Sequence, residues 1–412
     1  MFKVTGHHST YDFTGVTINF DTDLLKAFGR EDVHQVQILG NYNVLKNLKM
    51  VDVGSRTDRP TWRATNVVLD GSYNRIEGFH MTVKGSWPYG YGDAFGKGGN
   101  YVIKHFKHCA ILIRGESNHV KACTMMHMAY GHAIYMQAAN NALIEDCYVE
   151  GEIRSTDDML AERGSGSPAD KVDFKTVWGY PLPAGFMMSL QEGGIRAYNG
   201  GHTVIDGKAY ERGTTHVTVV NCTIKNMRTG ITLTHAKGKK LVRGSTTIGC
   251  ERGFCIGSGD IINCRGDARY GPVFGIDYES NRNCRAEITI LSNDDSYNGN
   301  SQLTYIIGNG HYITFRGSDN GSNQALTIDI AGQYDVVRSR DAPVKAASHV
   351  EIHNLTTYPL RMGGNSSDTF GESCGVIINQ GLITMSTELI ATKPINNWGF
   401  VITVLSRKLI FL

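Results

Sequence analysis

Five short segments of the chain share one pattern, and their polar positions hold residue types that can do chemistry. The segments are residues 110–114, 133–137, 194–198, 230–234 and 253–257. In each, the second and fourth residues are apolar or small, so strand alternation points them inward and turns the third and fifth residues outward. The polar side chains at these outward positions in the first three segments are Arg114, Tyr135, Gln137, Arg196 and Tyr198.

Arginine and tyrosine in this pattern suit an anionic sugar. A guanidinium binds a uronate carboxylate through two hydrogen bonds. Neutralising the carboxylate acidifies the hydrogen on the adjacent carbon, because negative charge develops there in the transition state. A nearby tyrosine, histidine or lysine can take that proton, which is the chemistry of β-elimination. We therefore predict Arg196 as the neutralising cation and either Tyr198 or His132 as the base, since His132 directly precedes the second segment.

The other residues near these segments are predicted to contact substrate. They are Arg114, Tyr135, Gln137, His235, which follows the fourth segment, and Lys237. The plain alternative is an exposed sheet face with ordinary side-chain contacts and no reaction.

Glycoside hydrolysis is the rival chemistry, and it needs a carboxylic acid and a carboxylate facing the scissile bond. Asp157, Asp158 and Glu192 flank the same region. The adjacent aspartates lie in an irregular stretch instead of a coil strand, which weakens the match. Clustered carboxylates can also bind calcium, which stays a third and weaker possibility because no EF-hand loop is present. No histidine or cysteine spacing is typical of a metal site, so no metal or other cofactor is predicted.

A repeated phrase places these segments on a regular scaffold. A turn glycine, an asparagine and a short alternating apolar stretch recur at residues 40–48, 71–79 and 115–123, and partial copies follow at 140–147, 216–222 and 261–264. Cys123 and Cys147 hold the same place in their copies and lie 24 residues apart, close to the periods of solenoid proteins. The units alternate as strands do, and glycine and asparagine mark the corners. Stacked coils of about 4.8 Å spacing would bring the outward residues into one patch.

This phrase and its spacing resemble the right-handed parallel β-helix of the pectin-lyase-like superfamily over roughly residues 1–360. The resemblance implies an all-β solenoid with loop insertions, and β-elimination is a common reaction in that superfamily. No full catalytic signature of the pectate lyases, polygalacturonases, chondroitinase-B and alginate lyases or mannuronan epimerases is found. The leading prediction is thus a polysaccharide lyase, with a glycoside hydrolase and a non-catalytic carbohydrate-binding or adhesive solenoid as alternatives.

The chain is predicted to form a single domain over residues 1–412, with two excursions from the coil rhythm. Residues 84–107 and 151–191 are the excursions, and aromatic residues in the first of them either stack on sugars or form small local cores. Residues 390–412 are predicted to be a C-terminal cap or final strand. Cys123, Cys147, Cys222 and Cys264 are expected to form an internal ladder of small apolar side chains.

Composition excludes several classes of protein. The net charge of +2 argues against a nucleic-acid partner, and no apolar run approaches the roughly 18 residues of a membrane span. Glycine is abundant at 48 of 412 residues, which favours a chain with many tight turns. No signal peptide is present in the sequence, and the predicted location is outside the cell or in the periplasm. The expected partner is an anionic polysaccharide, and the oligomeric state is left open.

Overall fold

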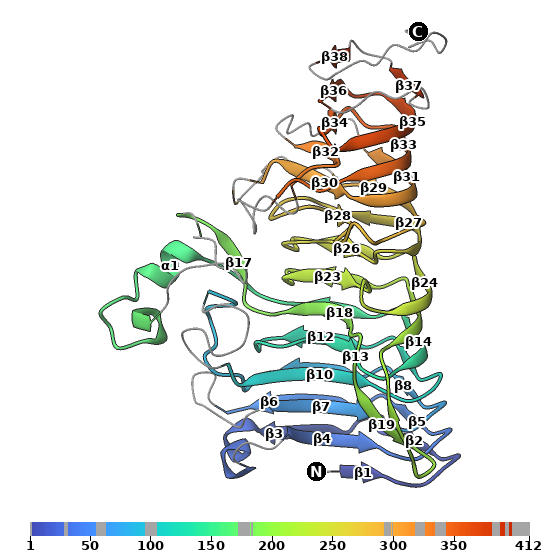
Figure 1. The fold of residues 1–412 in the computed structure, drawn as a ribbon. Coiled ribbons are helices and arrows are strands. Elements are labelled where there is room, and N and C mark those ends of the chain that lie inside the picture. The colour runs from blue at the N-terminus through green and yellow to red at the C-terminus, as the bar shows by residue number, and fades with distance from the viewer. Residues whose placement is uncertain are drawn as a thin grey trace. The chain divides into compact units, whose positions relative to one another are not determined.

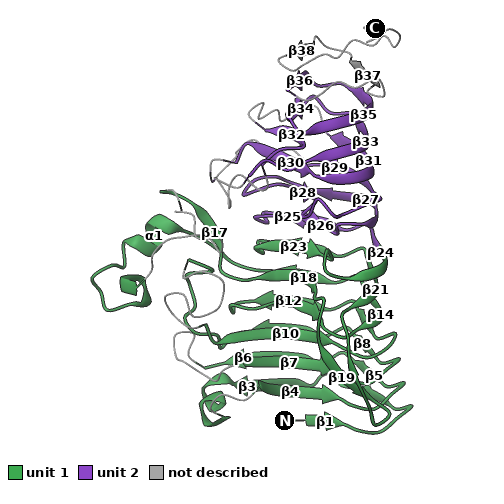
Figure 2. Ribbon diagram, viewed as in Figure 1, with its two compact units in different colours: residues 1–240 green, residues 241–412 purple. Residues whose placement is uncertain are grey.

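The computed structural model divides the chain into two compact units, residues 1–240 and 241–412 (Figure 2). The described residues are 2–28, 32–54, 63–94, 105–171, 182, 184–291, 298, 300–317, 326–333, 343–380, 388–391 and 395–397. Each unit is built from short parallel strands, so the predicted all-β parallel solenoid is confirmed (Figure 1).

In unit 1 each coil contributes a strand to one or more of three parallel ladders. Ladder A contains β1 (Phe2–Val4), β4 (Asp32–Ile38), β7 (Arg63–Leu69), β10 (Lys107–Ile113), β13 (Ile134–Met136), β18 (Gly193–Ala197) and β23 (Thr229–Thr232). Ladder B contains β2 (Thr10–Asp12), β5 (Val44–Lys46), β8 (Arg75–Glu77), β11 (His119–Lys121), β14 (Asn140–Glu145), β21 (Thr215–Val220) and β24 (Lys237–Arg243). Ladder C contains β3 (Thr17–Asp21), β6 (Lys49–Val53), β9 (His80–Val83), β12 (Thr124–His127), β15 (Tyr148–Glu150) and β22 (Thr223–Lys225). The 3₁₀ helix η1 (Thr22–Phe28) follows β3.

The repeated phrase has a direct structural cause at the corner between ladders A and B. The backbone N–H groups of Asn43 and Asn74 donate to the side-chain oxygens of Asn74 and Asn118, each at 2.9 Å, so buried asparagines link successive coils. A Cβ atom on Gly71 would lie 2.0 Å from the carbonyl oxygen of Gly40, so only glycine allows the coils to approach this closely. The spacing of glycine and asparagine thus encodes coil stacking.

The interior of unit 1 confirms the predicted ladder of small apolar side chains. Cys123, Cys147 and Cys222 are buried, and Leu48 and Phe79 are buried at the equivalent place in earlier coils. Cys264 is also a buried free thiol within unit 2.

Three excursions leave the coils of unit 1. The described residues of the 151–191 excursion form the antiparallel pair β16 (Ile153–Ser155) and β17 (Met187–Ser189), with the short helices α1 (Thr156–Leu160) and η2 (Pro168–Lys171) between them. The described part of the 84–107 excursion packs on this one, because Arg154 donates to the carbonyl of Gly90 at 3.1 Å. The third excursion, the hairpin β19 (His202–Ile205) and β20 (Lys208–Glu211), was not predicted from the sequence.

Unit 2 repeats the same parallel construction. One ladder contains β26 (Phe254–Cys255), β28 (Phe274–Gly275), β30 (Gln302–Ile306), β32 (Thr327–Ile330), β34 (Leu360–Met362), β36 (Ile377–Asn379) and β38 (Ile395–Asn397). The other contains β25 (Thr246–Ile248), β27 (Gly259–Gly266), β29 (Cys284–Ile290), β31 (Gly308–Gly317), β33 (Ala347–Asn354), β35 (Ser366–Ser373) and β37 (Glu388–Ala391). Within the predicted cap, β38 pairs in parallel with β36, and residues 398–412 lie outside the described part of the chain. No helix of the described residues is long and apolar enough to cross a membrane.

Candidate active site

Strand register places the predicted site residues on neighbouring coils of ladder A. Tyr135 on β13 pairs with Arg196 on β18, and Leu112 on β10 pairs with Tyr135. Arg196 pairs in turn with Thr232 on β23. The predicted alignment is therefore confirmed for the first four of the five segments, and Tyr135 and Arg196 share one sheet face because paired positions point the same way.

His132 and Tyr198 form the closest contact of the site, with 2.6 Å between His132 Nε2 and Tyr198 Oη. The backbone N–H of Gly193 donates to His132 Nδ1 at 3.0 Å. A neutral imidazole has one N–H and one acceptor nitrogen, so the ring carries its proton on Nε2 and donates to Tyr198. Burial lowers the pKa of His132 to about 3, which keeps the ring neutral at neutral pH.

The Tyr198 hydroxyl has two opposing electrostatic neighbours. Burial raises its pKa above the ordinary tyrosine value, and the negative charge of Glu192 raises it further, whereas the Arg196 guanidinium lowers it. The guanidinium carbon of Arg196 lies 5.2 Å from the centre of the Tyr198 ring. Because Tyr198 accepts its hydrogen bond from His132, its own O–H proton is directed elsewhere.

The positive charge of Arg196 has no carboxylate ion-pair partner within the described part of the chain. Among the residues that the structure describes, its contacts are with the Tyr198 ring and with His235, and its Nε makes no hydrogen bond although it is buried. Arg196 Nη2 lies 3.4 Å from His235 Nδ1. Arginine has no acceptor, so Nδ1 of His235 accepts and the neutral ring carries its proton on Nε2.

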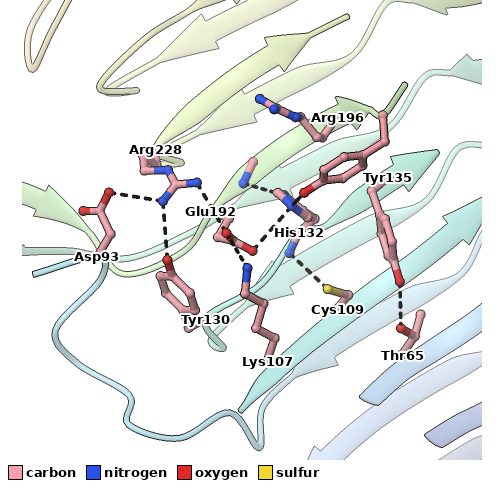
Figure 3. A network of polar contacts seen from close by, with 12 residues as sticks. Thr65, Asp93, Lys107, Cys109, Tyr130, His132, Tyr135, Glu192, Arg196 and Arg228 are labelled. Atoms are coloured by element: carbon pink, nitrogen blue, oxygen red, sulfur yellow. Dashed lines mark hydrogen bonds and ion pairs between the residues drawn. The ribbon is translucent and has the colours of Figure 1, made fainter. Parts of the chain in front are cut away.

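Beside His132 lies an ion-pair network centred on Glu192, whose carboxylate is buried (Figure 3). Its Oε1 lies 2.7 Å from Lys107 Nζ and 3.4 Å from Arg228 Nη2, and its Oε2 lies 3.4 Å from His132 Nε2. Arg228 Nη1 also bonds Asp93 Oδ2 at 3.1 Å. The network therefore holds two carboxylates and two cations, so its formal charges cancel and Arg196 is the excess positive charge beside it.

Glu192 is ionised in this setting. Burial by itself raises the pKa of a carboxyl group, but the positive charges of Lys107 and Arg228 outweigh burial and hold the pKa of Glu192 well below its usual range. A permanently ionised Glu192 cannot donate the proton that a hydrolase acid must give to a leaving group.

Glu192→Gln is expected to lower stability by about 3 kcal/mol, because it leaves two largely buried cations without their shared partner. Urea unfolding followed by circular dichroism measures the change. Glu145→Gln is the matched control, since Glu145 pairs with His119 and Lys121 near the surface and its loss should cost less than about 1 kcal/mol. Equal shifts in the two variants would contradict the importance given to this network.

The remaining predicted contact residues are less available for substrate. Arg114 Nη1 is bound to Asp70 at 2.9 Å, so its charge is already balanced. The Tyr135 hydroxyl lies 3.1 Å from Thr65 Oγ1 and so points along the sheet away from Arg196 (Figure 3). Gln137 lies under the start of the hairpin, where a Cβ atom on Gly201 would come within 2.7 Å of it. Lys237 is exposed at the start of β24.

The two adjacent aspartates predicted as alternative acids are not part of this cluster. Asp157 and Asp158 are exposed in α1, on the projecting excursion, whereas Glu192 directly precedes β18 (Figure 1). Asp157 accepts a hydrogen bond from the backbone N–H of Gly185 at 2.8 Å, which is a structural task. Among the described residues no group of three or more His, Cys, Asp or Glu side chains is placed to hold a metal ion.

Four residues of the network were missed in the sequence: Asp93, Lys107, Arg228 and Tyr130, whose hydroxyl accepts a hydrogen bond from Arg228 Nη1 at 3.4 Å. A signal existed for Arg228, because it stands three residues before Ile231 as Glu192 stands three before Ile195, and these isoleucines pair. Opposite charges at equivalent places on neighbouring coils predict an ion pair. Asp93 had no such signal, because it lies in an excursion.

Comparison with known proteins agrees with the fold. Residues 98–264 match the family model described as "Right handed beta helix region". This protein is a right-handed parallel β-helix. The predicted resemblance to that fold is thereby confirmed. A comparison of the β-helix with curated proteins finds no match.

Three solved structures similar to this β-helix are an alginate lyase, a family 6 polysaccharide lyase and a hydrolase. The alginate lyase AlyF-OU02 in complex with G6 is 12% identical, with a TM-score of 0.40, over 96% of this chain and 78% of that chain. A mannuronic acid specific polysaccharide family 6 lyase from human gut microbiota is 11% identical, with a TM-score of 0.40, over 95% and 81%. The endo-xylogalacturonan hydrolase from Aspergillus tubingensis is 10% identical, with a TM-score of 0.32, over 94% and 84%. Likenesses this distant carry no argument about function.

Proposed function

We propose that the protein is a polysaccharide lyase that cleaves a uronate-containing glycan by β-elimination. One observation carries the proposal: the Arg196 guanidinium has no carboxylate partner among the described residues, and its carbon lies 5.2 Å from the centre of the Tyr198 ring. A uronate carboxylate bound at Arg196 would supply the missing counter-charge. The carbon that must lose its proton, C5, would then stand next to the group that takes it.

In this proposal Tyr198 is the base and His132 holds it. The phenolate of Tyr198 takes the C5 proton, the C5–H electrons form the C4–C5 double bond, and the bond from C4 to the glycosidic oxygen breaks. The N–H of His132 Nε2 stabilises the phenolate at 2.6 Å. His132 itself is a poor base here, because its acceptor nitrogen is occupied by the Gly193 N–H. The sequence left Tyr198 and His132 as alternatives, and the geometry favours Tyr198.

A tyrosine base predicts activity that rises with pH. Because burial and Glu192 raise the pKa of Tyr198, the phenolate is a minor form at neutral pH and its population grows about tenfold per pH unit. We expect log kcat/KM to rise with a slope near one through the neutral range. The rise in log kcat should occur at higher pH than the rise in log kcat/KM, because a bound carboxylate offsets the Arg196 charge that lowers the Tyr198 pKa. A profile that stays flat through the neutral range would instead indicate His132 as the base, because its pKa of about 3 leaves the ring neutral there.

A screen for product chemistry tests the proposal. The protein is incubated with alginate, pectate, ulvan and glycosaminoglycans, and both ultraviolet absorbance from unsaturated uronate ends and new reducing ends are measured. A rise in both supports the lyase. Reducing ends without absorbance would indicate hydrolysis, and binding without either would indicate a carbohydrate-binding or adhesive protein.

A further inference from the structure

We infer that the elimination is syn, and that the substrate is a uronate whose C5 hydrogen and C4 oxygen lie on the same face of the ring, as in β-D-mannuronate or D-glucuronate. This inference rests on the proposed function. The inference depends on which side chain can return a proton to the departing C4 oxygen.

Elimination needs a base for C5 and an acid for the C4 oxygen, and Tyr198 is suited to both. Its hydroxyl accepts from His132 Nε2 at 2.6 Å, so the proton it carries after taking one from C5 is free to go to another acceptor. That acceptor is the leaving oxygen, and the transfer regenerates the phenolate. The balance is complete: the C5 proton reaches the new hydroxyl through Tyr198, and no other reactant is needed.

The neighbouring described groups are poorly placed for the acid role. His132 and His235 are each held as neutral rings, because a donor from Gly193 or Arg196 occupies Nδ1. A neutral imidazole N–H is a very weak acid. Glu192 is ionised and so has no proton to give, because its Oε1 binds the Lys107 ammonium at 2.7 Å.

Tyr135 is a second tyrosine on this sheet face, and its hydroxyl faces another coil. Its oxygen lies 3.1 Å from Thr65 on β7, whereas its backbone pairs with Arg196 on β18. The side chain therefore extends away from the carboxylate position and not toward a second face of a sugar bound there. Of these two tyrosines, Tyr198 is the one whose ring lies next to the Arg196 guanidinium.

One oxygen can serve both C5 and C4 only from one side of the ring. In β-D-mannuronate and D-glucuronate the C5 hydrogen and the C4 oxygen lie on the same face, so one hydroxyl reaches both within hydrogen-bond distance. In L-guluronate, L-iduronate and D-galacturonate they lie on opposite faces, and elimination needs two groups on the two sides. The arrangement of Tyr198 thus selects for the first class.

Homopolymers separate the two classes. Polymannuronate, polyglucuronate, polyguluronate and polygalacturonate are incubated with the intact protein at equal uronate concentration and pH, and the rise in absorbance is measured. We expect cleavage of polymannuronate or polyglucuronate, with rates on the other two at least about 100-fold lower, the size of a missing acid–base group.

The outcomes distinguish the inference from the proposed function. Comparable rates on both classes, or cleavage of polyguluronate or polygalacturonate alone, would overturn the syn inference and leave the lyase intact. Absence of unsaturated products from all four polymers, from alginate and from the glycosaminoglycans would overturn both. Release of saturated products would also remove both, since hydrolysis leaves no double bond.

Discussion

Tyr198→Phe is expected to reduce kcat on the preferred uronate polymer by about 100- to 10,000-fold, the usual contribution of a proton-transferring side chain. Phenylalanine keeps the ring beside Arg196 and removes only the oxygen that His132 holds at 2.6 Å. KM should change little, because carboxylate binding is assigned to Arg196. Initial rates from absorbance at saturating substrate measure the effect.

The control for this variant is Tyr73→Phe. Tyr73 is 51% exposed and stacks on Tyr42 at a corner of the coils, so removing its hydroxyl should leave kcat unchanged. Circular dichroism and the urea midpoint of both variants check that the fold is retained. A Tyr198→Phe protein that keeps more than about a tenth of the wild-type kcat would exclude Tyr198 as the proton-transferring group.

Arg196→Ala is expected to lower kcat/KM by about 100- to 1,000-fold, because the guanidinium both binds the carboxylate and stabilises charge that grows in the transition state. Arg196→Lys should recover only part of this loss, since an ammonium keeps the charge but not the two-pronged hydrogen bonding. The loss should appear in kcat as well as in KM, which simple weakening of binding would not produce.

Arg243→Ala is the matched control for charge. Arg243 is exposed at the end of β24, and its removal changes the net charge by the same amount. If the two alanine variants lose activity equally, the effect is general electrostatic attraction of an anionic polymer and not a specific carboxylate contact. Raising the ionic strength in parallel assays separates these effects, because screening weakens long-range attraction most.

The scaffold and the grouping of the site were predictable because both follow from strand alternation and coil spacing. The alignment of Tyr135 with Arg196 follows from the spacing of the apolar residues around them, and the two residues are indeed paired on neighbouring strands. The role of Asp70 could have been predicted in the same way. It is the outward residue one coil below Arg114, so extending the alignment by one coil would have predicted the pair that neutralises Arg114.

Other features depend on contacts that no local pattern encodes. Asp93 reaches Arg228 from an excursion, whose path is set by packing and not by coil spacing. The proton position on His132 depends on the backbone N–H of Gly193, a residue 61 positions away in the sequence. Such a hydrogen bond decides whether a histidine is a base or a donor, and the residue type alone leaves both open.

The asparagine links that join Asn43, Asn74 and Asn118 have an evolutionary consequence. At the corners that these asparagines link, the close-packed coils leave no room for extra residues or for side chains on the glycines. Insertions and deletions are therefore expected at other corners. The equivalent corner two coils further along comes directly after Tyr198, and it lacks the glycine–asparagine repeat. There the chain accommodates an additional hairpin, His202–Glu211. Homologues are therefore expected to differ in length beside Tyr198 and to keep it constant at the locked corner, which makes this edge the natural place for new polymer preferences to arise.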